Sequence, residues 1–392
     1  MSEMKYDFLA PPRIVFGWGR RNEAGMLART LGHRAFVISG SRQLEARGIV
    51  SELYNSLHEA GVEVIRLATI SREPLIEDVD HAVISVCEYS PGADDLVVAI
   101  GGGAAIDLAK AVSALAVNRL DESVLDFLEG VGKGLQIIKP PLPMLAIPTT
   151  SGTGSEATKN AVISSLSPPF KKSLRSDLMV PRAVLVDPEL TVSLPRNITA
   201  WTGMDAITQL IESYVTRNAK PIPQALALHG LELALPALAT AVREGTSRPA
   251  RERMAHAALL SGMTLANSGL GLAHGVAAAL GVHCNVPHGL ACAVMLPAAI
   301  RVNLSVREAE FAKLGTLFTG RTWPTASAAA QAALETIVEL AAEIQIPRRL
   351  SEIGVRAEEI PQLVPASRGN SMNGNPRDVT DDELRTLLEE ML

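Results

Sequence analysis

Short apolar runs rich in β-branched residues alternate with helical stretches along the first half of the chain. Each run has the length of a strand and ends at glycine or at polar residues that favour a turn. The stretches between them repeat their apolar residues at the spacing of a helix. This alternation predicts a doubly wound, mostly parallel sheet that helices cover on both faces. The expected strands are residues 34–40, 63–68, 96–101, 144–148 and 183–187, and the helical stretches include residues 51–60 and 105–117.

The pattern changes after Pro188: β-branched runs disappear, and prolines divide a sequence rich in Ala, Leu and Glu into pieces of helical length. We therefore expect the second half to be all-helical. The change falls in the segment 187–195 (DPELTVSLP), where two prolines flank a stretch with a poor helical pattern. The prediction is an α/β domain over residues 1–190 followed by an all-helical domain over residues 191–392.

The composition fits a globular protein and excludes several classes. Of 392 residues 47% are hydrophobic, and the net charge is −6, which argues against a disordered chain. No segment has the ~18 uninterrupted apolar residues of a membrane span, because the most apolar one, residues 228–242, contains Glu232 and Pro236. The amino terminus lacks the basic start and apolar stretch of a secretory signal, so we expect a cytoplasmic protein. Basic residues form no run longer than pairs such as Lys171-Lys172, so neither nucleic acid nor a membrane is an expected partner.

The three cysteines are Cys87, Cys284 and Cys292. Their number is odd and no two of them form a C-x-x-C pair. We therefore expect neither a disulfide framework nor a thiolate zinc site.

Three consecutive glycines follow an expected strand and precede an expected helix in residues 96–110 (LVVAIGGGAAIDLAK). Without a Cβ at the turn, backbone N–H groups at the helix start can approach a pyrophosphate closely, and the helix dipole favours its negative charge. The motif is neither G-x-G-x-x-G nor a P-loop, so a merely structural tight turn stays open as the alternative.

A hydroxyl-rich segment follows the next expected strand. Residues 147–160 (IPTTSGTGSEATKN) contain five serines or threonines before Glu156. In open α/β sheets ligands bind beyond the carboxyl ends of the strands, so this segment and the glycine turn would meet the same nucleotide. The alternative is a turn that caps a helix near Glu156.

The end of the second strand bears on the choice of cofactor. An acidic residue there usually accepts hydrogen bonds from the adenosine ribose and repels a 2′-phosphate. This chain has Ser39, Gly40, Ser41 and Arg42 instead, and small hydroxyl residues with an arginine suit the extra phosphate. We therefore favour NADP(H) over NAD(H), while a solvated Arg42 with no role remains the alternative.

Residues that suit a catalytic metal occur in the second half. Asp205 and Gln209 are four residues apart and therefore share one face of a helix. His274 should lie on a later helix, and His288 beyond the glycine and proline that end it. One carboxylate and two imidazoles form a three-ligand site for zinc or ferrous iron with open positions. The spacing alone leaves ordinary core or surface histidines as the alternative.

In these motifs the chain resembles the iron-containing (group III) alcohol dehydrogenases. The resemblance implies a Rossmann-like nucleotide-binding domain over residues 1–190 and a helical metal-binding and substrate domain over residues 191–392, which is the dehydroquinate synthase-like architecture. It also implies a homodimer or a larger homo-oligomer. The motifs follow the family's order from about Pro12 to Glu390 and are GGGAAIDLAK (101–110), PTTSGTGSEAT (148–158), VLVDPELTVSLP (184–195), TGMDA (202–206), AHG (273–275), NVPHG (285–289) and GNPRDVT (374–380).

The same resemblance implies a metal site and a cofactor cleft built from these motifs. The metal ligands would be Asp205, His274 and His288, with Gln209 as a further candidate. The metal would activate the substrate oxygen; no catalytic side chain is assigned, and metal-bound water and the ribose hydroxyl are the open alternatives for moving the proton. The resemblance places Gly102, Gly103 and Asp107 at the pyrophosphate, and Thr149, Thr150, Thr153, Thr158, Asn160 and Lys172 along the cofactor cleft. Ser39, Gly40 and Ser41 are added at the ribose from their place at the end of the second strand.

Three positions depart from the family's pattern. Gly40 stands where the family has an acid, which agrees with a weaker preference for NAD. Gln209 stands where many members have a second metal-binding histidine; an amide oxygen is the poorer ligand, so the affinity for iron should fall. Glycerol dehydrogenases, which are similar, bind zinc with one Asp and two His, so catalysis need not be lost. Ala278 stands where many members have a histidine near the nicotinamide, so no proton relay can use that side chain.

We therefore expect an NAD(P)-dependent, metal-assisted alcohol dehydrogenase or aldehyde reductase that uses one iron or zinc ion. Hydride would pass between a small alcohol, or its carbonyl, and the nicotinamide. A metal-independent reductase resembling maleylacetate reductase is the nearest alternative, since Gln209 would suit it. A lyase of the dehydroquinate synthase type, a non-haem iron oxygenase and a non-catalytic binding module also stay open.

Overall fold

The structure is a computed structural model that describes residues 5–119 and 122–392, and it divides into two compact units. The α/β unit comprises residues 9–150 and 154–192. The helical unit comprises residues 193–392 together with the segment 151–153 and the residues up to Phe8. The main change from one unit to the other therefore falls between Val192 and Ser193.

A six-stranded sheet forms the centre of the α/β unit, and all its pairs are parallel. This confirms the predicted parallel sheet. Its strands, in the order β1-β8-β5-β4-β2-β3, are β1 (Ile14–Phe16), β8 (Ala183–Val186), β5 (Met144–Pro148), β4 (Asp95–Gly101), β2 (Arg34–Ser39) and β3 (Glu63–Thr69).

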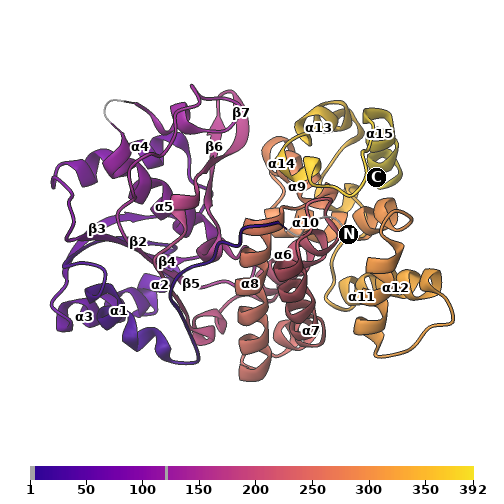
Figure 1. Ribbon diagram of the computed structural model, residues 1–392, viewed down its shortest axis with the longest axis horizontal. Helices are drawn as coiled ribbons and strands as arrows, with labels where there is room; N and C mark the ends of the chain where they lie inside the picture. The colour runs from indigo at the N-terminus through magenta and orange to yellow at the C-terminus, as the bar shows by residue number, and fades with distance from the viewer. Residues whose placement is uncertain (1–4, 120–121) are drawn as a thin grey trace. The chain divides into compact units, whose positions relative to one another are not determined.

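Helices cover both faces of the sheet, as Figure 1 shows with α4 and α5 above the strands and α1 and α3 below them. Side chains alternate between the faces along each strand. Phe36 and Ile38 pack with α4 and α5, whereas Ala35 and Val37 pack with α1 and α3. The helices of this unit are α1 (Ala24–Arg29), α2 (Arg42–Ala46), α3 (Ile49–Glu59), α4 (Ile76–Cys87) and α5 (Gly103–Asn118).

An antiparallel hairpin, β6 (Asn160–Leu166) and β7 (Pro169–Arg175), lies outside the main sheet and was not expected from the sequence. Its alternation of apolar and polar residues is weak, and its turn has none of the Asn-Gly type signals of a tight hairpin. The hairpin extends the hydroxyl-rich segment that follows β5.

The strand order reverses between β2 and β4. From β2 the chain adds β3 on one side, and from β4 it adds β5 and then β8 on the other. Loops at the carboxyl ends of two such strands diverge and leave a crevice that nucleotides commonly occupy. The fold therefore places the ends of β2, β4 and β5 at one edge, where the sequence predicted cofactor binding.

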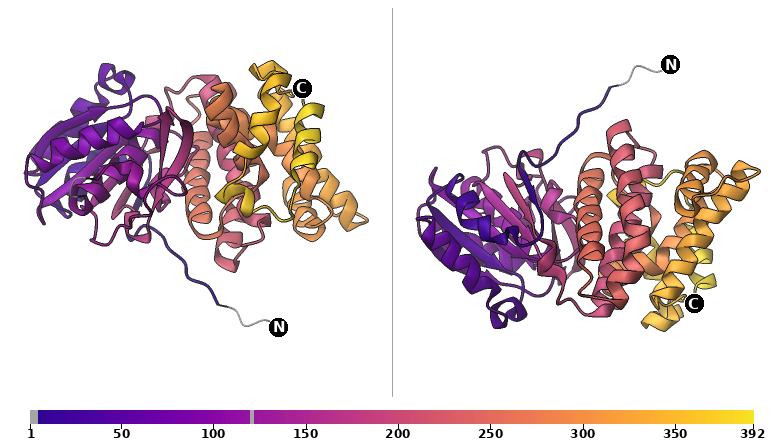
Figure 2. Two further views of the ribbon diagram at one scale, coloured as in Figure 1. Left: turned by 90° about the horizontal axis from the view of Figure 1, so that it is seen from above. Right: turned by 90° about the horizontal axis from the view of Figure 1, so that it is seen from below.

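The second half is all-helical, as predicted, and its helices share one apolar core. Figure 2 shows α7 and α8 side by side within this unit. The helices are α6 (Arg196–Val215), α7 (Pro221–Arg243), α8 (Arg248–Ser268), α9 (Leu272–Cys284), α10 (His288–Asn303), α11 (Glu308–Thr319), α12 (Ala326–Glu343), α13 (Ile360–Ala366), α14 (Asn370–Asn373) and α15 (Asp381–Glu390).

By length and apolarity alone α7 could cross a membrane, and α8 with α9 could count as a second span bent by 101°. Core helices of globular proteins meet the same criteria. Here α7 packs against α6 and α8, and its residues Leu231 and Leu238 are completely buried. Packing within the unit therefore accounts for the buried part of α7, which is 39% of its most apolar window.

Candidate functional site

Four side chains that can bind a metal ion converge inside the helical unit: Asp205 from α6, His274 from α9, and His288 and Cys292 from α10. Their ligand atoms all lie within 4.8 Å of one another. Asp205 Oδ1 is 3.2 Å from Nε2 of His274 and 3.8 Å from Nε2 of His288. The structure thus brings together the three residues that the sequence predicted as ligands; their role as ligands stays a prediction.

Local structure explains this convergence. α9 ends with its C-cap Asn285, whose left-handed φ is 55°, and α10 begins at His288 after Val286 and Pro287. A Cβ at Gly289 would lie 2.6 Å from the carbonyl oxygen of Trp201, so the start of α10 packs directly on the backbone of α6. This close approach brings His288 to Asp205, which follows Trp201 by one helical turn.

Asp205 is ionised in these surroundings. Burial raises the pKa of its carboxyl group, but the imidazoles of His288 and His274 lower that pKa by more. A buried carboxylate beside two imidazoles is typical of sites that hold a divalent cation.

Cys292 lies one helical turn after His288, and its Sγ is 3.7 Å from His288 Nε2. The side chain is completely buried, and burial raises the pKa of the thiol to about 12. From the sequence no thiolate was expected here. The spacing of four residues between His288 and Cys292 indicates a shared site only once α10 is known to begin at His288. Both side chains then lie on one face of the helix.

A further set of polar groups supports His274 from behind. Its Nδ1 is 2.7 Å from Oε2 of Glu212, whose Oε1 accepts a hydrogen bond of 2.7 Å from the backbone N–H of Ala273. Glu212 follows Asp205 by seven residues on the same face of α6. The carboxylate holds the imidazole so that Nε2 faces Asp205, which is how ligand histidines are usually oriented.

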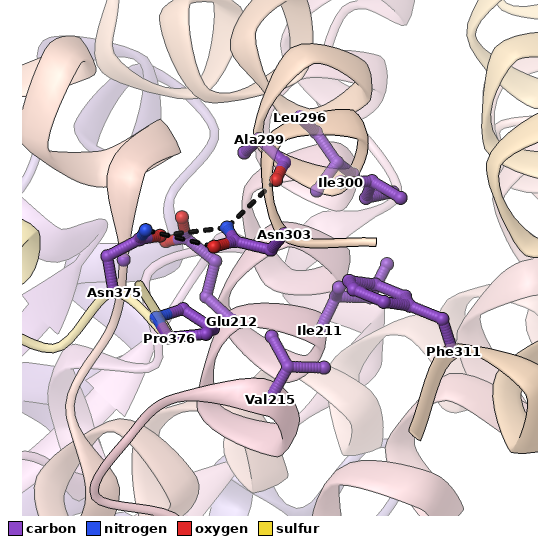
Figure 3. A pocket seen from close by; sticks show the side chains of 11 residues that line it. Ile211, Glu212, Val215, Leu296, Ala299, Ile300, Asn303, Phe311, Asn375 and Pro376 are labelled. Carbon is purple, nitrogen blue, oxygen red and sulfur yellow. Dashed lines mark hydrogen bonds between the residues drawn. The ribbon is translucent and has the colours of Figure 1, made fainter. Parts of the chain in front are cut away.

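Figure 3 shows that Glu212 borders a small cavity beside a pair of asparagines, Asn303 and Asn375. These two side chains bond to each other twice, with both distances 2.9 Å. Asn375 also accepts a hydrogen bond of 3.2 Å from the N–H of Leu272, the first residue of α9. The asparagine pair therefore anchors the helix that carries His274. Asn375 lies in the GNPRDVT motif, although sequence reasoning gave it no role.

Gln209 turns its amide nitrogen toward the cluster. Nε2 is 3.4 Å from Asp205 Oδ1, while Oε1 accepts a hydrogen bond of 2.8 Å from the hydroxyl of Ser261. In this orientation Gln209 donates to the carboxylate and presents no oxygen to an ion. Its assignment as a further ligand stays a prediction, and this geometry does not favour it.

In the α/β unit the glycine turn joins β4 to α5, as predicted. α5 begins at Gly103, and Gly102 before it is extended and provides no side-chain cap. A Cβ on Gly102 would lie 3.3 Å from the methyl group of Thr150, and the N–H of Thr149 donates to Gly101 over 2.9 Å. The glycine turn and the start of the hydroxyl-rich segment are therefore neighbours at one edge of the sheet.

The end of β2 lies against the end of β4. A Cβ on Gly40 would lie 2.6 Å from the Cα of Gly101, so the close approach of the two strands requires glycine there. Ser39 Oγ is bonded to Thr69 Oγ1 at 2.8 Å, and Ser41 caps α2. Close packing of the two strand ends thus explains why glycine stands at position 40, where the family has an acid. The preference for NADP that we inferred from this glycine stays a prediction.

Asp107 and Lys110 of α5 hold the hydroxyl-rich segment in place. Asp107 accepts hydrogen bonds from the Ser155 hydroxyl and, over 3.1 Å, from the N–H of Val162. Lys110, which is 1% exposed, donates to the carbonyl of Ser155 over 2.8 Å and to the hydroxyl of Thr158 over 2.7 Å. Sequence reasoning missed Lys110, although it lies three residues after Asp107 and so shares its helix face.

The three remaining predicted cofactor residues lie in three different places. Asn160 begins β6, and its carbonyl accepts a hydrogen bond from Lys110. Lys172 lies on β7 opposite Ile163. Thr153 belongs to the short segment that is part of the helical unit.

Comparison with models of protein families gave matches over both halves of the chain. The model described as iron-containing alcohol dehydrogenase matches residues 11–188, and the C-terminal model of the Fe-containing alcohol dehydrogenase family matches residues 199–392. Together the two cover nearly the whole sequence.

Individual relatives are similar over nearly their whole length. The probable alcohol dehydrogenase EutG of Escherichia coli (strain K12) is 32% identical over 378 residues, which cover 96% of this chain and 92% of the relative. The NAD-dependent methanol dehydrogenase of Bacillus methanolicus is 31% identical over 388 residues, which cover 98% of this chain and 100% of the relative. The crystal structure of a 1,3-propanediol oxidoreductase superposes with a TM-score of 0.91 at 30% identity and covers 99% of this chain and 100% of its own.

Proposed function

The chain belongs to the iron-containing alcohol dehydrogenase family, and from this premise we propose that it transfers hydride between a small alcohol, or its aldehyde, and the nicotinamide of NAD or NADP at a site that holds one divalent ion. It is an oxidoreductase that acts on CH–OH groups. The observation that carries the proposal is the convergence of Asp205, His274 and His288 inside the helical unit.

The donor set fits a divalent cation. One ionised carboxylate and two imidazole nitrogens within 4.8 Å of one another suit zinc or ferrous iron. An ion bound there supplies a Lewis acid that polarises the oxygen of the alcohol or carbonyl group.

The chain's own residues prepare this site. Glu212 would accept a hydrogen bond from Nδ1–H of His274 when an ion is bound, and Nε2, which faces Asp205, would then be the nitrogen that binds the ion. Gln209 donates to Asp205 and so limits the rotation of that carboxylate. Asn375 holds the start of α9, and thereby the backbone position of His274. These contacts fix the positions of the metal-binding atoms before an ion or a substrate binds. Accurate hydride transfer needs reacting groups held in fixed positions.

We propose that the edge formed by β2, β4 and β5 binds the nicotinamide cofactor. The backbone N–H groups at the start of α5 have no side-chain cap, so they can donate to a pyrophosphate that lies against Gly102 and Gly103. Thr149 and Thr150 adjoin this turn. Asn160 Oδ1 is buried and has no hydrogen-bond partner within residues 5–119 and 122–392, so a bound donor can satisfy it.

The other predicted cofactor residues divide into two groups. Asp107 and Thr158 bond to Ser155 and Lys110, so we propose that they shape the loop rather than touch the phosphates. Contact with the cofactor is proposed for Ser39, Gly40 and Ser41 from their place at the end of β2, and for Thr153 and Lys172 from the resemblance. The choice of NADP over NAD, a homodimer and a cytoplasmic location likewise stay predictions.

Removal of the ion tests the proposal. Exhaustive chelation should abolish the change in nicotinamide absorbance that a panel of small alcohols and aldehydes produces, and added zinc or ferrous iron should restore it. Asp205→Asn should lose both the bound ion and the activity. Full activity in protein shown to contain less than one ion per chain would instead support the metal-independent reductase. Turnover without net change in nicotinamide would support the lyase.

A further inference from the structure

We propose that Cys292 is the fourth protein ligand of this ion, so that one carboxylate, two imidazoles and one thiolate hold it and the site prefers zinc to ferrous iron. The inference rests on the proposed function for the presence of an ion. It adds a donor that neither the sequence motifs nor the resemblance supplied.

The position of the sulfur carries the argument. Cys292 Sγ is 3.7 Å from His288 Nε2 and within 4.8 Å of the donor atoms of Asp205 and His274. A tetrahedral ion with bonds of about 2.0 Å to N or O and 2.3 Å to S separates its donors by roughly 3.3–3.5 Å. The separations of 3.2, 3.8 and 3.7 Å around Asp205 and His288 are close to that arrangement.

The helix geometry makes the pair His288 and Cys292 well suited to one ion. They lie one turn apart on α10, and their side chains therefore project to the same side. Both reach the cluster from the element that packs directly on the backbone of α6. The ion would consequently join α6, α9 and α10.

Gln209 leaves the fourth position open. Its oxygen accepts the hydrogen bond from Ser261, and its nitrogen, which cannot serve as a ligand, points to Asp205. A thiolate is a softer donor than an amide or a carboxylate oxygen, and soft donors select zinc over ferrous iron. The alternative role of Cys292 is that of a small apolar residue that fills space in the core.

Cobalt(II) distinguishes these two roles. The full-length protein is stripped of metal with a chelator and titrated with Co²⁺ alone, and the near-ultraviolet absorbance is recorded. A thiolate ligand produces a sulfur-to-cobalt charge-transfer band, whereas a buried thiol that only fills space produces none. In the zinc-loaded protein, X-ray absorption should show one sulfur neighbour at about 2.3 Å besides the nitrogen and oxygen neighbours.

Cys292→Ser preserves the volume and should abolish the band and the sulfur neighbour. It should also weaken zinc binding by more than about tenfold, since even outer-shell partners of a metal ligand contribute 10–100-fold. Cys284→Ser is the matched control, because Cys284 lies at the end of α9 outside the cluster. It should leave the band and the affinity unchanged. Circular dichroism and thermal melting establish that both variants fold.

Other outcomes overturn the inference and separate it from the proposed function. If wild-type protein binds one Co²⁺ without the band, and Asp205→Asn abolishes that binding, the metal-assisted function stands and Cys292 is no ligand. A sulfur-to-cobalt charge-transfer band that persists in Cys292→Ser would show that another cysteine provides the thiolate. If the stripped protein binds no Co²⁺ and keeps its activity, both proposals are wrong. If Cys292→Ser does not fold, X-ray absorption of the zinc-loaded wild-type protein is the test. A sulfur neighbour at about 2.3 Å supports the inference, and its absence overturns it.

Discussion

Single buried side chains determine much of the chemistry of this protein. Glu212 orients His274 in the proposed metal site, and Lys110 holds the segment at the proposed cofactor-binding edge. That Asp205, His274 and His288 lie together could be predicted from the sequence, because their motifs are specific. The contacts of Cys292 and Lys110 could not be predicted. They depend on the helix face that each side chain occupies and on the segment that packs against that face.

Glu156 makes stability depend on pH. Burial raises the pKa of its carboxyl group from 4.5 to about 7, while its own backbone N–H and the charge of Lys110 act in the opposite direction. The folded state therefore binds this proton more tightly than the unfolded chain does. The stabilising contribution is complete below about pH 4.5 and is lost as the pH rises through about 7.

Glu156→Gln removes this loss. The variant should be more stable than wild type at about pH 8 by about 3 kcal/mol, because each unit of pKa difference corresponds to 1.36 kcal/mol. The advantage should shrink toward zero at about pH 4.5. Urea denaturation across this range measures the difference. If the difference in stability between Glu156→Gln and wild type does not vary with pH, packing causes it and not the titration of Glu156.

Lys110→Met should destabilise the α/β unit. The substitution keeps the volume but leaves the acceptors at Ser155, Thr158 and Asn160 without the ammonium group, which should cost about 2–4 kcal/mol. Lys133→Met is the control, since that lysine is exposed and its ion pair with Asp126 is worth less than about 1 kcal/mol. Chemical denaturation compares the two. Equal effects would mean that the buried contacts of Lys110 add nothing.

At the level of elements, the turns at strand ends matter most. The five strands predicted from their apolar runs agree with β2, β3, β4, β5 and β8. The hairpin of β6 and β7 was missed because hydroxyl-rich sequence around it suits a loop as well as a strand. Strand order could not be predicted either, since which strands pair depends on contacts between distant segments.

The contact of β2 with β4 at Gly40 predicts a specific sensitivity. Gly40→Ala introduces a Cβ 2.6 Å from the Cα of Gly101, so the strand ends must separate. The expected cost is about 1–3 kcal/mol of stability, as for other overpacked sites, together with weaker binding of NADH and NADPH. Nicotinamide fluorescence measures the binding. Gly92→Ala, where a Cβ meets open space, should change neither property.

For the whole molecule, a cluster drawn from distant parts of the helical unit links ion binding to folding. Asp205 and Cys292 are 87 residues apart, and the donors come from three helices. An ion that binds only the folded state stabilises it by mass action. The two halves of the chain and their fold classes could be predicted from the change in pattern after Pro188. The packing that brings these helices together could not, because it depends on close contacts such as that of Gly289 with Trp201.

Zinc should therefore raise the stability of the wild-type protein, by about 4 kcal/mol when its free concentration is ~1,000 times Kd. Melting temperatures with zinc and with excess chelator provide the measurement. Asp205→Asn should melt at the same temperature under both conditions. If zinc raises the melting temperature of Asp205→Asn as much as that of wild type, the stabilising ion binds at another site.

One helix, α6, carries both the carboxylate that faces the cluster and the carboxylate that orients His274. Asp205 and Glu212 cannot move independently, so any slight turning of α6 about its axis shifts both together. Substitutions on α6 that touch no metal-binding atom, for instance at Gly203, which packs against Leu238 two residues before Asp205, can thereby change the affinity for the ion. Natural variation in metal preference can accumulate through such packing changes while the donor atoms themselves stay constant.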